Sequence, residues 1–458
     1  MEKKIAIYRG SFNPPGRRHR LVAETLCKEF DEVIVVPWHR LPGETIKYDI
    51  PPVYRATMID LAFQGLPKVR IEFFDLEAGE YTPARNVLEK ITFHGDIWFI
   101  LRPDMIRGGA IGESRVHRSR DERFWKDQQF LIVRKAQEEI DPSDLPPRHR
   151  FLDIEEGVDS EEIRSRIFHK QQISDWIDPK VEAYIRRRSL YTGMPQTRTT
   201  RFQIDEVRPL IVTDEWNKKS QEMRKKLPGE NTEDPNIILV VGGDGTMLRA
   251  IRKLWRKRLP FYGINTGHLG FLLNSGLPPD LVGQSLIVEQ LSMLRVETLG
   301  LDGERKISLA FNEAWVERVT GQTAWIEVTV DGRVRLNKMV ADGALVSTAA
   351  GSASYARAMG AAPLPLSTPA LLLVGSNVLY PVFWQPAVLP LNSKVELRTL
   401  DLVKRPLNGF VDGVPQGKVS WMGVKTSNIA AVELAFDPRH DPAEKLARIQ
   451  FPTAGDAE

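Results

Sequence analysis

Short apolar runs alternate with amphipathic segments along the first part of the chain. Because short apolar runs bounded by turn residues indicate buried strands, we predict strands at Lys4–Tyr8, Val33–Val36, Val69–Phe73, Ile97–Leu101 and Phe130–Val133. Helices are predicted between and after them, at His19–Glu29, Pro51–Phe63, Ser160–His169 and Pro179–Arg188. This alternation is typical of a doubly wound parallel sheet. Residues 1–193 are therefore predicted to form a Rossmann-like α/β domain.

The pattern changes twice further along the chain. A polar stretch rich in Gly, Pro, Thr and Arg predicts a linker at residues 194–201. A second α/β lobe is predicted over 202–294, with a buried strand at Ile237–Val241 and a helix at Met247–Leu254. Strict alternation then begins, as in Ala324–Val330, and Asp331-Gly332 follows as a hairpin turn. Residues 295–436 are therefore predicted to be mainly β, and the polar residues 437–458 to be a loose tail.

Composition narrows the class of protein. At 458 residues the chain is long enough for several domains, and its 42% apolar and 27% charged residues are typical of soluble globular proteins. A net charge of +3 suits small anionic substrates and is too weak to indicate nucleic acid. The single cysteine, Cys27, excludes an intrachain disulfide and a cysteine-based zinc site. With no signal-peptide pattern at the first residues and no apolar stretch of membrane length, we expect a cytoplasmic protein without a membrane partner.

Gly242-Gly243-Asp244-Gly245-Thr246 joins the buried strand at 237–241 to the helix at 247–254. A Gly-rich turn in that position places backbone N–H groups and a helix N-terminus where they can hold phosphate. The turn also carries an acid, Asp244, which a phosphate would repel unless a cation bridges them or the acid takes a proton. The turn therefore indicates a kinase-like site.

Four segments in order resemble the signatures of the NAD kinase family. They are Gly242–Thr246, Phe261–Leu272, Asn312-Glu313 and the loop Asp342–Tyr355, and a late Asp412-Gly413 also matches. The resemblance implies that Asp244 takes the proton of the NAD 2′-hydroxyl as ATP, with Mg²⁺, donates a phosphoryl group. It also implies phosphate contacts from Gly243, Gly245 and Thr246, and nucleotide contacts from Asn312, Glu313, Asp342 and Tyr355. Related kinases are oligomers, so we expect a homo-oligomer.

The loop before Tyr355 departs from the family pattern. Ala349, Ala350 and Ala353 stand where the family has a proline and two hydroxyl residues, so Ser352 or Ser354 is expected to supply a hydroxyl instead. Whether ATP or polyphosphate is the donor therefore stays open.

A second phosphate motif, Gly10-Ser11-Phe12-Asn13-Pro14-Pro15-Gly16-Arg17-Arg18-His19, lies between the first strand and the first helix. Gly10 is expected to allow close approach of the backbone to a phosphate, and His19, at the helix start, to donate a hydrogen bond to it.

The same motif resembles the nucleotidyltransferase superfamily, specifically mononucleotide adenylyltransferases. The likeness spans residues 4–192, although Gly16 replaces the first residue of the family's His/Thr-x-x-His and Arg18 replaces a small residue. It implies that His19 and Arg164 stabilise the pentavalent phosphorus formed when nicotinamide or nicotinate mononucleotide attacks ATP. The nucleotide-binding residues that it implies are Gly10, Ser11, Phe12, Lys47, Asp104, Trp125 and Ser160, with Trp125 packing against the pyridine ring.

Together the resemblances predict a bifunctional enzyme that makes NAD and then phosphorylates it, with no metal ligated by the protein itself. Two alternatives stay open. The first half could be an inactive nucleotide-binding module that regulates a kinase, or the second half could be a lipid or sugar kinase, against which Gly263–Phe271 argues. Mononucleotide preference and any channelling between sites are also open.

Overall fold

The computed structural model describes residues 3–41, 43, 45–92, 95–116, 122–136, 138–155, 157–267, 269–276, 281–439 and 442–451. His268 of the second kinase-like signature lies outside these ranges. The chain divides into two compact units, Met1–Gln196 and Thr197–Glu458. The boundary falls inside the segment expected to be a linker, and strand β7 (Thr199–Gln203) begins within that segment as part of the second unit.

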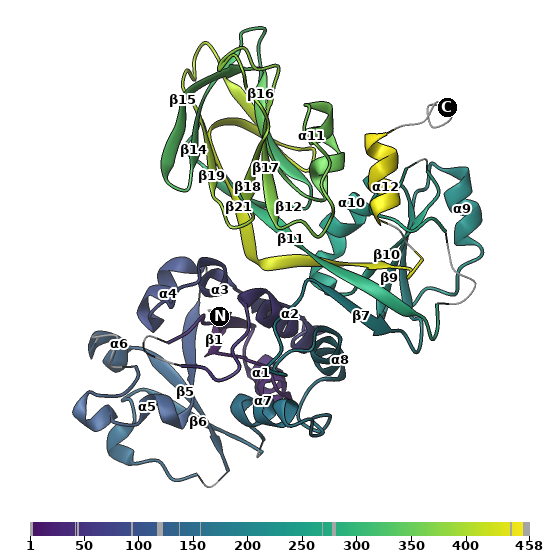
Figure 1. Cartoon of the computed structure of the whole chain (residues 1–458). Coiled ribbons are helices and arrows are strands. Elements are labelled where there is room, and N and C mark those ends of the chain that lie inside the picture. Colours follow the sequence, from purple (N-terminus) through teal and green to yellow (C-terminus); the bar gives the residue numbers. More distant parts are fainter. Residues whose placement is uncertain are drawn as a thin grey trace. The chain divides into compact units, whose positions relative to one another are not determined.

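The first unit contains a six-stranded parallel sheet in the order β3-β2-β1-β4-β5-β6 (Figure 1). Its strands are β1 (Lys4–Gly10), β2 (Glu32–Pro37), β3 (Val69–Ile71), β4 (Asp96–Leu101), β5 (Gln129–Lys135) and β6 (His149–Ile154). The predicted parallel sheet is confirmed, and four of the predicted runs form the mostly buried or half-buried strands β1, β2, β4 and β5, while β3 is half-buried along its length. The order reverses between β1 and β4, so the loops after Gly10 and Leu101 diverge from the same edge of the sheet, where α/β proteins commonly bind ligands.

The helices of the first unit lie between and after these strands. They are α1 (Arg17–Glu29), α2 (Pro52–Ala62), α3 (Phe74–Ala78), α4 (Ala84–Lys90), α5 (Pro103–Ile106), α6 (Glu122–Asp127), α7 (Ser160–Phe168) and α8 (Pro179–Arg188), with short 3₁₀ turns η1 (Gly109–Ile111) and η3 (Pro142–Asp144). One hydrophobic cluster of this unit joins Ile5 and Ile7 of β1 to Phe99 of β4 and Phe130 of β5.

The second unit begins with a small α/β lobe. Parallel strands β8 (Pro209–Thr213), β9 (Ile237–Gly242) and β10 (Phe261–Asn265) lie in that order. Helices α9 (Lys218–Arg224) and α10 (Asp244–Leu254) accompany them, with the 3₁₀ turn η4 (Trp255–Lys257) after α10.

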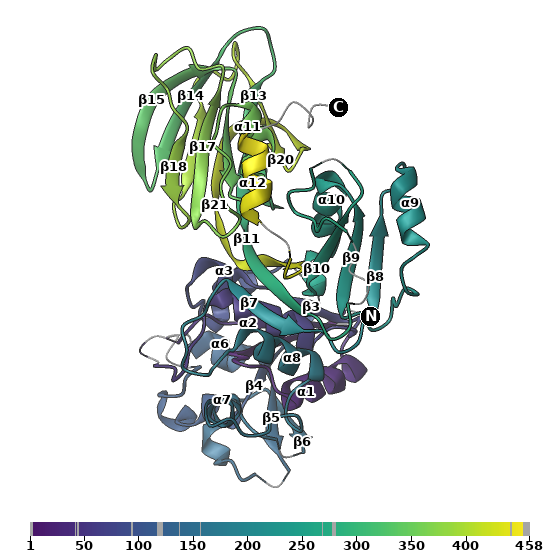
Figure 2. The same ribbon diagram turned by 45° about the vertical axis from the view of Figure 1, so that its right-hand side comes forward.

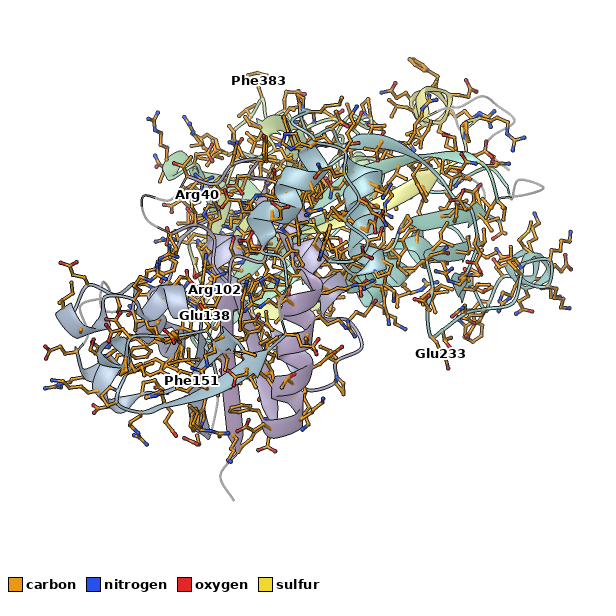
Figure 3. All side chains as sticks on the ribbon, turned by 90° about the horizontal axis from the view of Figure 1, so that it is seen from below. Arg40, Arg102, Glu138, Phe151, Glu233 and Phe383 are labelled. Atoms are coloured by element: carbon orange, nitrogen blue, oxygen red, sulfur yellow. The ribbon has the colours of Figure 1, made fainter. Side chains whose placement is uncertain are left out.

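The remainder of the second unit is mainly β, as predicted (Figure 2). Its strands are β11 (Ser285–Gly300), β12 (Arg305–Ala310), β13 (Glu313–Arg318), β14 (Ala324–Val330), β15 (Arg333–Ala341), β16 (Gly343–Thr348), β17 (Ala370–Ser376), β18 (Ala387–Pro390), β19 (Val395–Thr399), β20 (Leu407–Val411) and β21 (Val414–Phe436). β14 and β15 form the expected hairpin around Asp331-Gly332. Between β16 and β17 lie η5 (Gly351–Ala353) and α11 (Tyr355–Ala358), and the turn after β17 carries Phe383, which is 92% exposed (Figure 3).

Strands β11 and β21 connect the two lobes. They pair antiparallel from Ile287 and Phe436 to Gly300 and Val419, with register shifts between Ser292 and Leu294 and between Leu299 and Gly300. The last part of β21 also pairs in parallel with β10 of the α/β lobe. Both lobes therefore belong to one continuous sheet.

The residues after Phe436 differ from the expected loose tail. They include a helix, α12 (Pro442–Gln450), whose Ile449 is 2% exposed and packs in the core of the α/β lobe. Within the described ranges, none of the helices combines the length and apolar content needed to span a bilayer.

Candidate active sites

Asp244 is the first residue of α10, directly after the buried strand β9 and the N-cap residue Gly243. Both oxygens of its half-buried carboxylate accept hydrogen bonds from backbone N–H groups, Oδ2 from Phe271 at 2.9 Å and Oδ1 from Leu272 at 2.8 Å. Because a carboxylate oxygen has two lone pairs, each oxygen can still accept one further hydrogen. The second signature, through its backbone, therefore orients the acid of the first.

The residues expected to contact phosphate around Asp244 differ in whether their N–H groups already have a partner. Thr246 is buried, its hydroxyl donates to Asp214 at 3.2 Å, and its backbone N–H donates to the carbonyl of Gly243 at 2.9 Å. The hydroxyl and the backbone N–H of Thr246 therefore both have partners that hold the turn, and its phosphate contact stays a prediction. The first N–H groups of a helix lack intrahelical partners, so those of Asp244 and the exposed Gly245 stay suited to an anion.

Asn312 and Glu313 lie at the start of β13, where Asp412 fixes their backbone. Its buried carboxylate accepts from the N–H groups of Phe311, Asn312 and Glu313 at 2.7, 2.9 and 3.1 Å. Burial raises the pKa of Glu313 to about 8, and Asp412 adds to the effect. Burial raises the pKa of Asp412 as well, although the three N–H donors favour its charged form. Glu313 therefore carries a proton at neutral pH.

Two oxygens of this pair face no hydrogen-bond donor. Asn312 Oδ1 and Glu313 Oε2 are buried and have no partner among the described residues. Buried polar groups are nearly always hydrogen-bonded in folded proteins, so an unmatched pair in one place points to a bound ligand or water.

The side chain of Asp342 is paired with protein groups, whereas that of Tyr355 is partly exposed to solvent. The Asp342 carboxylate pairs with Arg318 at 2.8 Å and accepts from the Asn377 amide at 2.8 Å, so both oxygens already have protein partners. Tyr355 is 37% exposed, and burial raises its pKa, as do the charges of Glu317 and Glu313. Tyr355 thus lies within electrostatic reach of Glu313.

The separate signatures of the second unit meet around α10. One hydrophobic cluster contains Met247 of α10, Phe271 and Leu272 of the second signature, Phe311 and Ala350. Arg252 of α10 also donates to the carbonyl of Asp412 at 3.0 Å. Arg252 was not identified from the sequence, since its partner lies far along the chain.

The serines of the Asp342–Tyr355 loop also differ in accessibility. Ser352 is buried, donates to the carbonyl of Ala349 at 2.6 Å and accepts from the N–H of Leu364 at 2.8 Å. Ser354 is exposed. Of the two hydroxyls expected to replace those of the family, only that of Ser354 is therefore accessible.

His19 lies in the first turn of α1. The N–H of Gly16 donates to its Nδ1 at 3.0 Å, so the proton of the neutral ring is on Nε2. Burial, together with the Arg102 and Arg18 guanidinium groups, lowers the pKa of His19 to about 3. His19 is therefore a neutral hydrogen-bond donor in a positive field. Arg102, which follows β4 across the edge of the sheet, was not identified as a site residue from the sequence (Figure 3).

Ser160 and Arg164 of α7 bind the loop between β1 and α1. The Ser160 hydroxyl donates to the carbonyl of Pro14 at 2.8 Å, and Arg164 donates to the carbonyls of Asn13 at 2.5 Å and Lys47 at 3.0 Å. The two motifs, far apart in sequence, therefore meet. Arg164 is 9% exposed and mainly shapes the loop, and the exposed Lys47 takes part in this network through its carbonyl.

The glycines of the first motif have packing roles. A Cβ on Gly10 would lie 2.9 Å from the ring of Phe12, so this glycine makes room for the buried Phe12 rather than for a phosphate. A Cβ on Gly16 would lie 3.1 Å from both Ile163 Cδ1 and the Trp176 carbonyl, so a larger residue would displace its neighbours. The carbonyl of Ser11 accepts from the buried guanidinium of Arg55.

Asp104 and Trp125 complete the expected site of the first unit. Asp104 pairs with Arg102 at 2.9 Å and Arg115 at 3.3 Å. Trp125 is 7% exposed and packs against Phe130 in the core, and its role as a platform for a pyridine ring stays a prediction. The arginines around Asp104, unlike Trp125, are accessible to an anionic nucleotide.

Comparison with solved structures gives partial matches. Yeast NADH kinase complexed with NADH matches with a TM-score of 0.41 and 18% identity, over 51% of this chain and 77% of that chain. An NAD kinase from Archaeoglobus fulgidus in complex with ATP matches with a TM-score of 0.40 and 24% identity, over 52% of this chain and 98% of that chain.

Sequence comparison identifies the family. Residues 164–286 match the model of the ATP-NAD kinase N-terminal domain. The NAD kinase of Zymomonas mobilis is 32% identical over 243 residues, which are 52% of this chain and 94% of that protein. The NAD kinase of Brucella melitensis is 35% identical over 222 residues, 48% of this chain and 86% of that protein. About half of the chain thus accounts for nearly the whole of such relatives, and with the four signatures assembled around Asp244, the chain belongs to the NAD kinase family.

Proposed function

We propose that the second unit transfers the γ-phosphoryl group of ATP to the adenosine 2′-hydroxyl of NAD. The carboxylate of Asp244, held by the backbone N–H groups of Phe271 and Leu272, is the observation that carries this proposal. A fixed carboxylate at a helix N-terminus can accept a proton close to donors that bind phosphate. Membership of the NAD kinase family supports NAD as the acceptor.

The reaction makes one bond and breaks one at phosphorus, and it moves one proton. The 2′-oxygen forms a bond to the γ-phosphorus, the bond from that phosphorus to the bridging oxygen breaks, ADP leaves, and the hydroxyl proton passes to Asp244. The N–H groups of Asp244 and Gly245 donate to phosphate oxygens.

Mg²⁺ enters this proposal with ATP. Among the described residues no three His, Cys, Asp or Glu side chains gather as a metal site. An ion that arrives with ATP is held mainly by nucleotide phosphates and water, with at most one or two carboxylates. When bound, Mg²⁺ neutralises charge on the phosphates.

Asn312, Glu313 and Tyr355 orient the dinucleotide in this proposal. The protonated Glu313 donates a hydrogen bond and Asn312 Oδ1 accepts one, which satisfies the two buried oxygens that lack protein partners. Asp342 acts through Arg318 and Asn377, since its own oxygens are already paired.

Replacement of the acid tests the kinase proposal. Asp244→Asn keeps the side-chain size but removes the proton acceptor, so we expect the rate of NADP formation from NAD and ATP to fall by roughly 10²–10⁴-fold. Asp205→Asn, at an exposed position of the same unit, is the matched control and should keep the wild-type rate. Undiminished NADP formation by Asp244→Asn would contradict the proposal.

We propose a second activity, adenylyl transfer from ATP to a pyridine mononucleotide, for the first unit. It is favoured by the meeting of the Gly10–His19 motif with Ser160 and Arg164 at the edge of the parallel sheet where the strand order reverses. An oxygen of the mononucleotide phosphate bonds to the α-phosphorus, the bond to pyrophosphate breaks, and the neutral His19 Nε2–H donates to a non-bridging oxygen. NAD made here is the substrate of the second unit. We further propose that the protein is cytoplasmic and assembles as a homo-oligomer.

Replacement of His19 separates the adenylyltransferase from a regulatory module. His19→Ala should lower pyrophosphate release from mononucleotide and ATP by roughly 10²–10³-fold, because one donor to the transition state is lost, while kinase activity on added NAD persists. The exposed His169→Ala is the control and should leave both rates unchanged. If the wild type releases no pyrophosphate and His19→Ala alters only the kinase rate, the first unit is a regulatory module.

A further inference from the structure

Helix α12 connects two parts of the kinase site. Figure 2 shows α12 beside α11. Leu446 and Ile449 of α12 pack in the hydrophobic cluster that contains Met247 of α10. The guanidinium of Arg357, in the short helix that begins at Tyr355, donates to the carbonyl of Ile449 at 2.8 Å. The helix thus contacts both the element that carries Asp244 and the element that carries Tyr355.

Lys445 of α12 binds the segment that orients Asp244. Its half-buried ammonium donates to the carbonyl of Gly270 at 2.7 Å and to the carbonyl of Leu273. The two residues between these carbonyls, Phe271 and Leu272, donate their N–H groups to Asp244. The segment Gly270–Leu273 is therefore held by a cation through its outer carbonyls and by an anion through its inner amides.

We infer that Lys445 is a positioning residue of the kinase reaction, whose ammonium group fixes Gly270–Leu273 and thereby sets the orientation of the Asp244 carboxylate. The inference rests on the proposed kinase function of the second unit. Two fixed amides determine which lone pairs of Asp244 stay open to the 2′-hydroxyl. Misplacement of such a group by about 1 Å can slow a reaction by roughly 10²-fold. We call the two hydrogen bonds from Lys445 to the carbonyls of Gly270 and Leu273 the clamp. Loss of the clamp should therefore lower kcat more than it raises KM.

The charges around Lys445 predict how the clamp depends on pH. Asp244 faces it from α10, and Glu444 and Arg448, which pair at 3.0 Å, flank it on α12. The pKa of Lys445 is lowered to about 8, mainly by burial and less by Arg448, while Asp244 opposes the change. As the pH rises above about 8 the ammonium loses its charge, and its charge-assisted hydrogen bonds to the two carbonyls weaken. Kinase activity should therefore fall on the alkaline side.

Glu313 titrates in the same pH range, since its pKa is raised to about 8. The wild-type profile alone therefore cannot assign the alkaline fall to one group. Lys445→Arg separates them, because a guanidinium stays charged at every accessible pH and leaves Glu313 unchanged.

The test measures kcat and KM for NAD from pH 6 to pH 10 in the full chain. Lys445→Gln should lower kcat roughly 10–10²-fold at neutral pH, with KM changed about twofold or less. Lys445→Arg should keep most of the wild-type kcat. The part of the alkaline fall that comes from loss of the lysine charge should disappear in this variant. Arg448→Gln, which removes a charge from the same helix and leaves the clamp intact, should keep that fall and shift it to higher pH.

Hydrogen exchange of the Phe271 and Leu272 amides gives a second measurement that does not need activity. Exchange should speed up in Lys445→Gln and stay at the wild-type rate in Arg448→Gln. Unchanged exchange in Lys445→Gln, or an unchanged alkaline fall in Lys445→Arg, would overturn the inference. A wild type that forms no NADP would instead remove the proposed kinase function, and the exchange measurement would still decide whether the clamp exists.

Discussion

Burial decides the protonation of the residues most important to both sites. His19 stays neutral because burial and two arginines disfavour its charged form, and Glu313 stays protonated because it is buried beside Asp412. From the sequence, both residues could be identified as site members by their motifs. Their protonation states could not, because they depend on neighbours such as Arg102 that are distant in sequence.

Glu313 makes the stability of the second unit depend on pH. Its pKa is about 8 in the folded chain against 4.5 ordinarily, so between these values the folded state holds a proton that the unfolded state has released. The free energy of unfolding should therefore fall with rising pH in this window, by up to about 1.4 kcal/mol per pH unit. Glu313→Gln should flatten this dependence, as measured by pulse proteolysis across a urea series at pH 5 and pH 8.

The exposed Glu304→Gln serves as the control for this experiment and should keep the wild-type slope. An equal slope in Glu313→Gln and the wild type would show that another group accounts for the dependence.

Among the elements, those with strong apolar patterns were predictable and those stabilised mainly by tertiary contacts were not. Strand β9 is buried along its whole length and was predicted from five consecutive apolar residues. Strand β6 is largely exposed and mixed in polarity, so its sequence carried no strand signal. Among the described side chains of helix α12, Leu446 and Ile449 are the ones that pack in this core, too few positions to show a helical period, and the helix was expected to be part of a tail.

Shortening the side chain of Ile449 tests whether burial of this residue holds α12 in place. Ile449→Ala should destabilise the packing of the helix by about 2–5 kcal/mol, because it removes buried methyl groups and leaves a cavity. Trypsin should then cleave after Lys445 and Arg448 faster than in the wild type. Gln450→Ala, exposed on the same helix, should not change the cleavage rate, and equal rates for the two variants would contradict a packing role.

At the scale of the whole molecule, the sequence predicted the parallel sheet and the β-rich lobe because these depend on repeated local patterns. It placed Asp244, Asn312 and Tyr355 in separate motifs, and the structure packs residues of or next to each motif, Met247, Phe311 and Ala350, in one hydrophobic cluster. The contacts that complete the site join residues far apart in the chain, as in the hydrogen bonds from Lys445 to Gly270 and from Arg252 to Asp412. Local periodicity contains no information on such distant pairs, so they could not be predicted from a single sequence.

The long strands β11 and β21 limit how the second unit can move during a reaction cycle. Since they pair through both lobes on either side of two register shifts, a wide hinge rotation would break many main-chain hydrogen bonds. The register shift between Ser292 and Leu294 is the one place near the lobe junction where the ladder is already interrupted, and it permits flexing rather than opening. For the proposed kinase reaction, we expect access for the two nucleotides to come from movement of surface loops over this frame, so turnover should respond to changes in those loops far more than to changes in the strands that join the lobes.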